Sequence, residues 1–310
     1  MYFKAASFLV LGIFCISVND TLIKLLSDRY ALHQIVFIRA SIGLLIILPP
    51  ILVRQGAAAL RTLRPGVHVF RGMLIVLANL TFFAGLATLP LAEASAVVFV
   101  APILITMFSH YFLSEQISVW RWAAVLIGLV GMICVVQPFG SRIEIAYLWP
   151  LAGAICYAGF TITTRVLGRT DSTASLAVYS TAAFLVMSVS MGLIVGNGSF
   201  INTDNPSLEF LLRAWHWPKI DDFGPIAAIG VLSAIIALAM SAAYRRGEAS
   251  FLAPFEYVNL PLVLLWGYLA FGDFPNALAL LGISMIILGG MIMIFKEGSS
   301  VRRRESSSKC

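Results

Sequence analysis

Charged residues are scarce in this sequence. They make up 12% of its 310 residues, about half of the share that is typical of soluble domains. Hydrophobic residues account for 60%, and the mean hydropathy is +0.93. Because the shortage of charge extends along the whole chain, it excludes a soluble domain with one anchor and indicates an integral membrane protein. The first apolar run lacks a small-residue cleavage site after it, so it does not have the pattern of a cleaved signal peptide.

Motifs for metal or nucleotide chemistry are also missing. No HExxH, paired-cysteine or phosphate-loop spacing occurs, so we expect no metal centre, no other cofactor, no nucleotide-hydrolysing motor and no enzymatic activity. Cys15, Cys134 and Cys156 lie inside apolar runs, and Cys310 ends a charged tail, so no disulfide framework is expected. The positive residues behind the net charge of +6 are scattered over short loops, which does not favour a nucleic-acid partner.

Long hydrophobic runs, by contrast, are abundant. A transmembrane helix takes about 20 largely apolar residues, and the stretches that qualify are 3–26, 31–53, 67–87, 92–113, 119–137, 145–166, 174–196, 223–245, 250–271 and 275–295. Most connections between them are short, so successive helices are expected to be antiparallel neighbours. The predicted fold is all-α, with ten transmembrane helices.

Lysine and arginine fall mostly on one side of these spans. The side of the N-terminus holds Lys4, Arg54, Arg61, Arg64, Arg71, Arg121, Arg165, Arg169, Arg245, Arg246, Lys296, Arg302, Arg303, Arg304 and Lys309. The other side holds Arg29, Arg142, Arg213 and Lys219. Because cytoplasmic loops are enriched in positive residues, both termini are predicted to be cytoplasmic, in a multi-pass protein of the cell inner membrane.

One connection on the predicted outer side is long, from 197 to 222. Asn205 could cap a helix there, with Pro206 at its first position. Trp215 and Trp217 suit the headgroup region. A short helix on the outer surface and a plain ordered loop are both compatible with this pattern.

Two long segments of the chain resemble each other, one beginning at Pro90 and the other at Arg246. The matched pairs are Glu93 and Glu248, Pro102 and Pro261, Glu115 and Asp273, and Gly131 and Gly289. Fainter matches are Gly12 and Gly153, Cys15 and Cys156, and Lys24 and Arg165. We therefore predict two five-helix repeats, 1–140 and 141–297 (with the outer loop 197–222), followed by a basic cytoplasmic tail, 298–310.

An odd number of spans in each repeat would invert the second copy relative to the first. Inverted repeats are the architecture of alternating-access transporters, which hold substrate near the bilayer midplane between the halves. The alternative is a chance similarity between apolar helices.

The segments FLSE at 112–115 and FGD at 271–273 add a family resemblance. With ten spans in two repeats, they resemble the EamA type of the drug/metabolite transporter superfamily, although Asp273 stands where that family usually has glutamate. The stretch APFEYVNLPLVLLWGYLAFGDFP is similar to members associated with uptake of vitamins or S-adenosylmethionine. The resemblance implies a central cavity walled by the first, third, fourth, sixth, eighth and ninth spans, and substrates such as amino acids, vitamins, nucleotide-like metabolites and drugs.

Ionisable residues within the spans are the candidate site residues. Asp20 and Arg39 lie at similar depth on adjacent helices, and buried charges in lipid need a partner, so we expect an ion pair between them. It could be a structural clamp or a part of the substrate or coupling site. Asp20 could instead pair with Lys24, one turn further along its own helix.

Glu256 lies inside the apolar run FEYVNLPLV, with Asn259 one turn further on the same face. Pro254 and Pro261 should interrupt this helix because proline has no amide hydrogen to donate. Glu256 has no acidic counterpart in the first repeat, which argues against a general structural role. The alternative is a polar contact between helices.

Other polar residues carry weaker signals. Asn79 and Tyr157 lie near the midplane and could contact substrate or bond between helices, and Phe255 and Tyr257 could stack on it. Conspicuous acids near helix ends are expected to be structural, because the repeats place their members on opposite faces. They are Glu93, Glu248, Glu115 and Asp273.

The sequence thus predicts a secondary transporter of an amino-acid-, vitamin- or nucleoside-like metabolite. Arg39 would attract a carboxylate or phosphate, and Glu256 would bind a cationic group or exchange a proton as coupling ion. Expected partners are the substrate and the lipid bilayer, in a monomer or homodimer. The alternatives are a membrane-embedded enzyme or flippase acting on lipid-linked substrates, and a passive channel or non-transporting partner protein.

Overall fold

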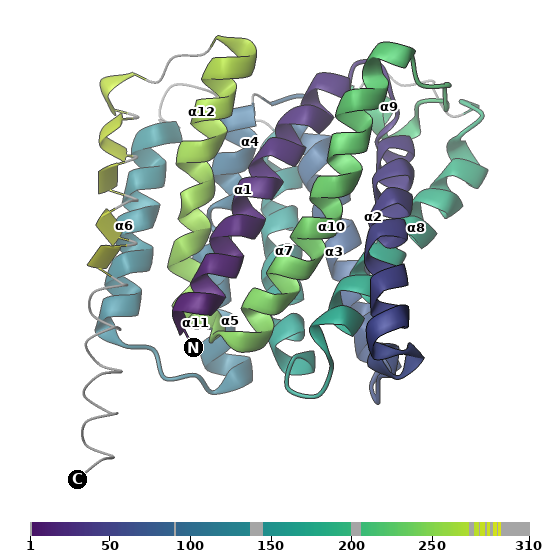
Figure 1. The fold of residues 1–310 in the computed structure, drawn as a ribbon. Coiled ribbons are helices and arrows are strands. Elements are labelled where there is room, and N and C mark those ends of the chain that lie inside the picture. The colour runs from purple at the N-terminus through teal and green to yellow at the C-terminus, as the bar shows by residue number, and fades with distance from the viewer. Residues whose placement is uncertain are drawn as a thin grey trace.

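The computed structural model describes residues 2–89, 91–136, 145–199 and 206–272, together with 276–278, 280–282, 284–285, 288–289 and 291–292. Across these ranges the chain is helical and contains no strand. The long helices run up and down in one bundle, and the N-terminus lies at its lower edge (Figure 1). The α-helices are α1 (Tyr2–Leu26), α2 (Leu32–Gln55), α3 (Pro65–Leu86), α4 (Leu91–Val98), α5 (Ala101–Leu113), α6 (Val119–Val136), α7 (Leu148–Leu167), α8 (Thr173–Val195), α9 (Pro206–Leu212), α10 (Phe223–Arg246), α11 (Ala249–Leu252) and α12 (Asn259–Phe271). The 3₁₀ segments are η1 (Ala57–Leu60), η3 (Ile145–Tyr147), η4 (Ile220–Asp222) and η5 (Ala253–Val258).

Six helical segments in the described part are long and apolar enough to cross a membrane. They are Phe3–Leu26, Leu32–Gln55, Pro65–Leu86, Thr173–Val195, Ile220–Arg246 and Ala249–Ala270. Large apolar side chains cover the outside of the bundle, among them Leu45, Val53 and Leu193, which are 72%, 85% and 83% exposed. In water such a large apolar surface would promote aggregation, so these faces are suited to contact with lipid. The chain is therefore a multi-pass membrane protein.

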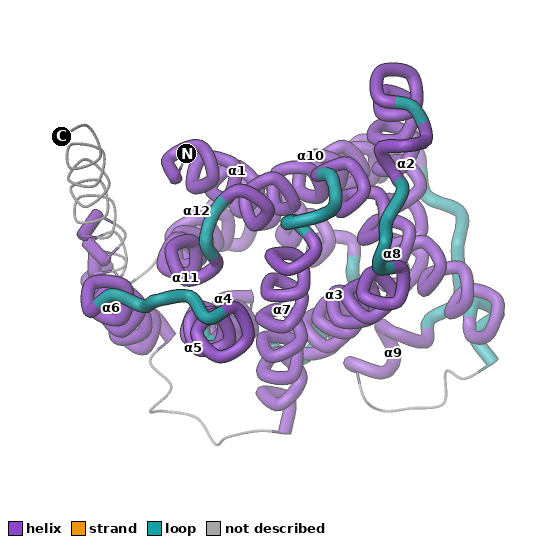
Figure 2. The backbone as a smooth tube through the Cα atoms, turned by 90° about the horizontal axis from the view of Figure 1, so that it is seen from below, coloured by secondary structure: helices purple, strands orange, loops and turns teal. Residues whose placement is uncertain are grey.

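Three of the remaining predicted spans also appear as helices, although they are shorter or less apolar. The predicted sixth span is α7, which lies between α3 and α5 when the bundle is seen from below (Figure 2). The fifth is α6, and the fourth is divided into α4 and α5. The predicted tenth span is helical at each residue described between 277 and 292. That all ten cross the membrane stays a prediction.

Proline explains where the fourth and ninth spans change geometry. Pro102 lies in the first turn of α5, directly after the break that separates it from α4. Pro254 lies in the first turn of η5, where the ninth span tightens into a 3₁₀ helix between α11 and α12. The Tyr257 carbonyl, which loses its usual helical donor at Pro261, accepts from the Asn259 amide instead. The interruption predicted for the ninth span is thus confirmed.

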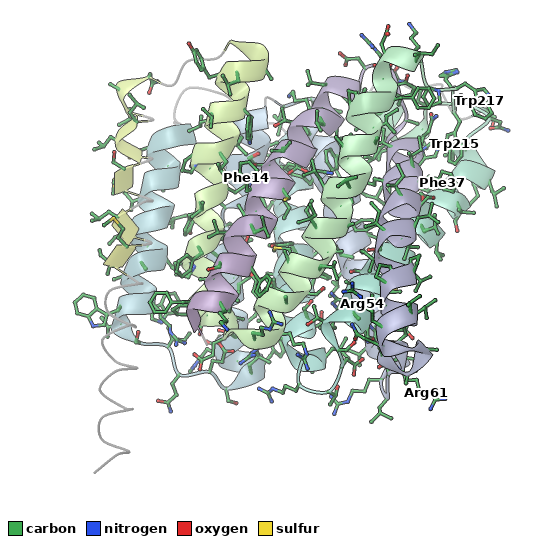
Figure 3. The ribbon with its side chains drawn as sticks, viewed as in Figure 1. Phe14, Phe37, Arg54, Arg61, Trp215 and Trp217 are labelled. Atoms are coloured by element: carbon green, nitrogen blue, oxygen red, sulfur yellow. The ribbon has the colours of Figure 1, made fainter. Side chains whose placement is uncertain are left out.

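The two ends of the bundle differ in chemistry (Figure 3). Arg54 and Arg61 lie at the lower end, which we call the basic end, and Trp215 and Trp217 lie at the opposite, tryptophan end. Within the long connection, α9 confirms the short helix, whereas Asn205, its expected cap, is outside the described residues. Trp217 is 96% exposed, as expected of a headgroup contact. Trp215 instead packs on Phe37, with ring centroids 5.2 Å apart.

Two apolar cores occupy the two ends. The core toward the basic end includes Leu9, Ile13, Tyr244, Phe251 and Phe255. The core toward the tryptophan end includes Ile23, Leu32, Phe83, Phe210 and Ile229. Polar side chains gather between the two cores, in the middle of the bundle.

Glycine permits the closest helix contacts beside this middle layer. A Cβ atom at Gly12 on α1 would lie 2.6 Å from the Met240 sulfur on α10. A Cβ atom at Gly153 on α7 would lie 3.1 Å from the Ala78 carbonyl oxygen on α3. The α1–α10 and α7–α3 pairs are therefore close-packed crossings beside the site.

Candidate functional site

A cavity of about 240 Å³ opens in the middle of the bundle. Its wall includes residues of α1, α3, α4, α5, α7, α10, η5 and α12, which belong to the six spans that the resemblance implied. Two further helices also contribute, α2 through Arg39 and Ala40, and α8 through Ser180, Thr181 and Phe184. Among the described residues, none of α6 lines the cavity.

Six of the eight predicted site residues share this wall: Asp20, Arg39, Asn79, Tyr157, Glu256 and Asn259. Phe255 and Tyr257 lie elsewhere. Phe255 packs in the basic-end core beside Phe251, at 5.5 Å between ring centroids. Tyr257 stacks on Phe99 at 5.8 Å.

The 3₁₀ geometry of η5 explains this division. In a 3₁₀ helix, residues three apart lie on the same face, so Glu256 and Asn259 both reach the cavity. Their neighbours Phe255 and Tyr257 are rotated away into protein packing. Substrate contact by these two aromatic residues stays a prediction without support from their placement.

Glu256 is held by tyrosines from two other helices. Tyr157 on α7 donates a hydrogen bond to Oε1 at 3.0 Å, and Tyr244 on α10 donates to the same oxygen. The carboxyl group is buried, and no basic side chain of the described residues forms an ion pair with it. Two phenols on Oε1 fix the orientation of this carboxyl group and leave Oε2 as its uncommitted oxygen.

Tyr244 was missed by reasoning from the sequence. It lies in the apolar run LAMSAAYRR near the predicted helix end, where a tyrosine normally marks the membrane interface. The side chain is instead fully buried and points inward. The pairing depends on the rotation of α10 about its axis, which the sequence pattern does not reveal.

Arg39 is held by amides and an aromatic ring. Its Nη2 donates to Asn79 Oδ1 at 2.9 Å, and its Nη1 donates to Asn19 Oδ1 at 3.4 Å. The guanidinium carbon lies 4.9 Å from the centroid of the Phe184 ring. These neutral partners satisfy donors but cancel no charge, so the positive charge of Arg39 acts on whatever fills the cavity.

The direct ion pair predicted between Asp20 and Arg39 is not formed. Both residues are described and line the cavity, but no carboxylate oxygen of Asp20 lies within 4.0 Å of the guanidinium. Asn19, the neighbour of Asp20 on α1, takes that place, and its Nδ2 bonds to the Ile229 carbonyl at 3.2 Å. The alternative pair is not seen either, since Lys24 Nζ reaches the Leu89 carbonyl at 3.5 Å.

The acids near helix ends have structural partners where they are described. Glu115 accepts from the amides of Ala249 and Ser250 at 3.2 and 3.0 Å, and so caps α11. Glu248 pairs with Arg121 at 2.6 Å. These contacts support the structural interpretation, while the Glu93 side chain and Asp273 lie outside what the structure describes.

The cavity therefore offers groups of both signs beside aromatic surface. Asp20, Arg39 and Glu256 supply charge, and the Asn259 Oδ1 atom is buried without a hydrogen-bond partner, so it is an acceptor available to a ligand. Aromatic side chains complete the wall: Phe82, Phe99, Tyr157, Phe160 and Phe184. Within the described ranges, no group of three His, Cys, Asp or Glu residues is arranged to hold a metal ion.

Comparison with known proteins finds transporters among the relatives of this chain. Residues 3–137 match the EamA-like transporter family. An S-adenosylmethionine uptake transporter of Rickettsia conorii is 24% identical over 99% of this chain and 97% of its own length. A riboflavin transporter of Rhizobium johnstonii is 29% identical over 80% and 76%, and the pseudopaline exporter CntI of Pseudomonas aeruginosa is 27% identical over 90% and 92%.

A solved structure supports the same fold. A crystal structure of a protein with 20% identity superposes with a TM-score of 0.72, covering 93% of this chain and 94% of the other. The family match in the first half, the transporters that align over most of the length, and the helical membrane fold agree with one another. The first half of this chain thus resembles the EamA-like transporter family, and the chain as a whole is similar to bacterial metabolite transporters.

Proposed function

We propose that this protein is a secondary carrier that moves a small organic metabolite across the cytoplasmic membrane by alternating access. The observation that carries the proposal is the central cavity, because it places charged groups of both signs between two apolar cores. An acid without a basic partner inside a membrane bundle is costly unless it serves a ligand or a proton. Glu256 meets that description.

The proposed substrate is amino-acid-, vitamin- or nucleoside-like. Arg39 would bind its carboxylate or phosphate, since its present partners are neutral. Glu256 would bind a cationic group through Oε2, or release a proton as substrate arrives. The aromatic wall would cover a ring or an aliphatic part. Relatives named as transporters of S-adenosylmethionine, riboflavin and pseudopaline support this class.

The proposed architecture is ten spans in two inverted repeats, with both termini in the cytoplasm of a bacterial-type inner membrane. The two close helix crossings support it, because the matched residues Gly12 and Gly153 lie at the α1–α10 and α7–α3 contacts. Under a repeat of five spans, these two contacts are equivalent. Transport would then be driven by a proton gradient or by substrate exchange.

Reconstituted protein provides the test. Proteoliposomes would be loaded with radiolabelled zwitterionic, cationic and anionic metabolites, and flux would be measured with and without a pH gradient. We expect saturable flux and counterflow of at least one zwitterion or cation. Arg39→Gln should abolish saturable flux of a carboxylate-bearing substrate, whereas Arg61→Gln, at the exposed basic end, should leave it unchanged.

Two outcomes would contradict the proposal. No flux of any metabolite by verifiably folded protein would count against a carrier. Flux that rises linearly with concentration and shows no counterflow would favour a channel instead.

A further inference from the structure

Two turns occupy equivalent places in the two predicted repeats. Tyr30 follows the last residue of α1 by four positions and precedes α2 by two, and Asp171 has the same spacing from α7 and to α8. The same interval in the sequence that separates Gly12 from Gly153 also separates Tyr30 from Asp171. The two side chains are therefore counterparts, in the turn between the first and second helices of each repeat.

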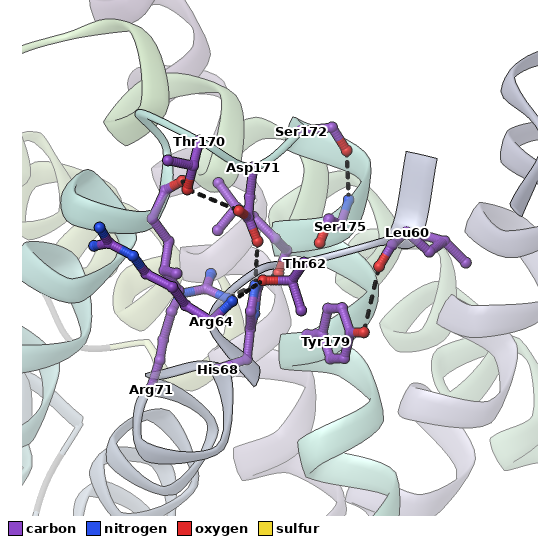
Figure 4. A network of polar contacts seen from close by, with 12 residues as sticks. Leu60, Thr62, Arg64, His68, Arg71, Thr170, Asp171, Ser172, Ser175 and Tyr179 are labelled. Atoms are coloured by element: carbon purple, nitrogen blue, oxygen red, sulfur yellow. Dashed lines mark hydrogen bonds and ion pairs between the residues drawn. The ribbon is translucent and has the colours of Figure 1, made fainter. Parts of the chain in front are cut away.

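Each of these side chains bonds to the other half of the chain. Asp171 Oδ2 lies 2.7 Å from Nε2 of His68, in the first turn of α3, and both side chains are almost fully buried (Figure 4). Tyr30 donates from its hydroxyl to Asp222 Oδ2 at 2.7 Å, directly before α10. In both cases a turn of one half contacts the start of the third helix of the other half.

The two contacts lie at opposite ends of the bundle. The first joins the start of α3 to the α7–α8 turn at the basic end (Figure 1). The second joins the α1–α2 turn to the start of α10 at the tryptophan end, where Lys219 N–H also donates to the Tyr30 hydroxyl at 3.0 Å. Arg29 adds an ion pair with Asp222 at 2.9 Å. Equivalent polar contacts therefore help to tie the two halves together at each end.

The contact at the basic end continues to the cavity wall. Arg71, one turn after His68, donates from Nε to Thr164 Oγ1 at 2.7 Å and from Nη1 to the Leu176 carbonyl at 2.9 Å. Its guanidinium carbon lies 4.5 Å from the centroid of the Phe160 ring, and Phe160 lines the cavity. Separating α3 from α7 at this end would therefore uncover the cavity.

Some polar atoms of this cluster are poorly satisfied in the closed arrangement. His68 Nδ1, Arg71 Nη2 and Ser175 Oγ are buried and have no hydrogen-bond partner. Unsatisfied buried groups gain hydrogen bonds when water enters. The closed state at the basic end is thus less favourable than its contacts alone suggest, which suits a contact that must open.

We propose that the His68–Asp171 and Tyr30–Asp222 contacts are two alternating locks, each of which closes one end of the cavity. This inference rests on the proposed alternating-access function. Opening the first lock exposes the cavity to the compartment at the basic end while the second lock stays closed. Opening the second lock exposes the cavity to the compartment at the tryptophan end while the first stays closed. The structure has both locks closed.

The test measures which side of the membrane reaches the cavity. Cys15, Cys134, Cys156 and Cys310 are replaced by serine, and Ala237→Cys in the cavity wall serves as reporter. Oriented proteoliposomes are then treated with a membrane-impermeant thiol reagent from one side at a time. Asp171→Ala should raise labelling from the basic end by roughly fivefold or more, with reduced labelling from the other end. Asp222→Ala should do the opposite.

Two controls separate a lock from general loosening. Asp28→Ala removes an exposed acid from the same turn as Tyr30, and it should label like the parent. Tyr30→Phe deletes only the hydroxyl and should act in the same direction as Asp222→Ala, which keeps the test open if an alanine variant fails to fold.

Contacts of Glu115 and Arg121 also hold the basic end, so Asp171→Ala is repeated with Glu115→Gln. Unchanged labelling in both the single and the double variant, or a shift toward the same end for Asp171→Ala and Tyr30→Phe, would overturn the proposal. Labelling needs no substrate. The proposal of two locks can therefore be disproved although transport is demonstrated. It can also be confirmed although none of the tested metabolites is transported.

Discussion

At the scale of single residues, the two charged groups of the cavity are held in different ways. Glu256 receives two phenol donors on one oxygen, whereas Arg39 gives its donors to two amides. Both arrangements use neutral hydrogen-bond partners, so neither charge is neutralised by a direct ion pair before a ligand arrives. A neutral hydrogen-bonded setting orients a charged group and keeps its field available in a medium of low dielectric constant.

Replacing Glu256 by glutamine should therefore affect the cationic part of a substrate. The amide keeps the shape and the tyrosine contacts but loses the charge, so the KM for a cationic or zwitterionic substrate should rise about tenfold or more. Transport by the variant should also lose its dependence on pH. Uptake measured from about pH 5 to 8 checks both effects. Glu209→Gln, on the surface helix α9, is the matched control, and a Glu256→Gln protein that transports like the parent at every pH would give this acid a structural role.

The Asn79 amide should stabilise the fold through Arg39. Asn79→Ala leaves Nη2 of a buried guanidinium without its 2.9 Å acceptor, which should lower the free energy of unfolding by about 1–3 kcal/mol. In the Arg39→Leu background the same change should cost much less, because the donor is gone. Thermal unfolding in detergent of the four proteins measures this coupling. Additive effects of the two changes would mean that the bond contributes nothing.

Asp171 should make stability depend on pH, since it lies in a turn outside the spans. Burial raises the pKa of its carboxyl group, but hydrogen bonds from His68, Thr62 and Thr170 outweigh burial and bring the pKa below its ordinary value of 3.8. Such a group stabilises the fold at pH values above the ordinary pKa, and this contribution is lost as the pH falls through the lowered one. His68 and Arg71, which face it, keep or gain positive charge as the pH falls.

The parent should therefore unfold at a higher temperature than Asp171→Asn at about pH 7, and the difference should shrink toward about pH 3. Melting curves of both proteins over this range provide the measurement. A difference that grows on acidification would contradict the assigned direction.

At the scale of elements, the irregular ninth span determines which side chains face the cavity. Its η5 segment seats Tyr257 against α6, where a Cβ atom at Gly128 would lie 2.3 Å from the tyrosine ring. Phe99 also stacks on that ring. The ring thus fixes the 3₁₀ segment between the fourth and fifth spans and, with it, the direction of Glu256.

Gly128→Ala should consequently displace η5. We expect a loss of about 1–3 kcal/mol of stability from overpacking and a reduced transport rate, because Glu256 shifts with its neighbour. Gly267→Ala on α12 is the control, since nothing lies within 4 Å of its Cβ position; alanine there should be neutral or stabilise the helix by about 0.5–1 kcal/mol. The melting temperatures and transport rates of the two variants test this prediction. Equal values for Gly128→Ala and Gly267→Ala would exclude the proposed role of Tyr257.

At the scale of the whole molecule, sequence reasoning succeeded where the membrane restricts the choices. Polar side chains at mid-depth must face the bundle interior, so hydropathy and depth are enough to predict that they share a cavity. The six that do so are Asp20, Arg39, Asn79, Tyr157, Glu256 and Asn259. The hydrogen-bond partners of these side chains could not be predicted from the sequence, because they depend on the rotation of each helix about its axis. That is why Asn19 and Tyr244 were missed and the direct Asp20–Arg39 pair was wrong. Phe255 and Tyr257 were proposed as stacking surfaces because they flank Glu256 in the sequence, but the structure packs them into apolar clusters beside the cavity.

The proposed orientation gives a prediction for the whole molecule. Leu63, 89% exposed near the basic end, and Trp217, 96% exposed at the tryptophan end, should be reachable from opposite sides of the membrane. In cells, a cysteine at position 217 should react with an impermeant reagent, whereas a cysteine at position 63 should react only after permeabilisation. The reverse pattern would invert the assignment of both termini.

The neutral partners of the cavity charges have a consequence for energetics. With Asp20, Arg39 and Glu256 all ionised, the empty cavity carries one net negative charge, which a monovalent cation would neutralise. If the cavity charge moves through the field, the membrane potential acts on the empty carrier and not on the loaded one, at about 2.3 kcal/mol per 100 mV for a full crossing. A potential that is negative inside would then return the empty site to the outside after each delivery. Uptake of a cation would thus accumulate substrate without a second ion.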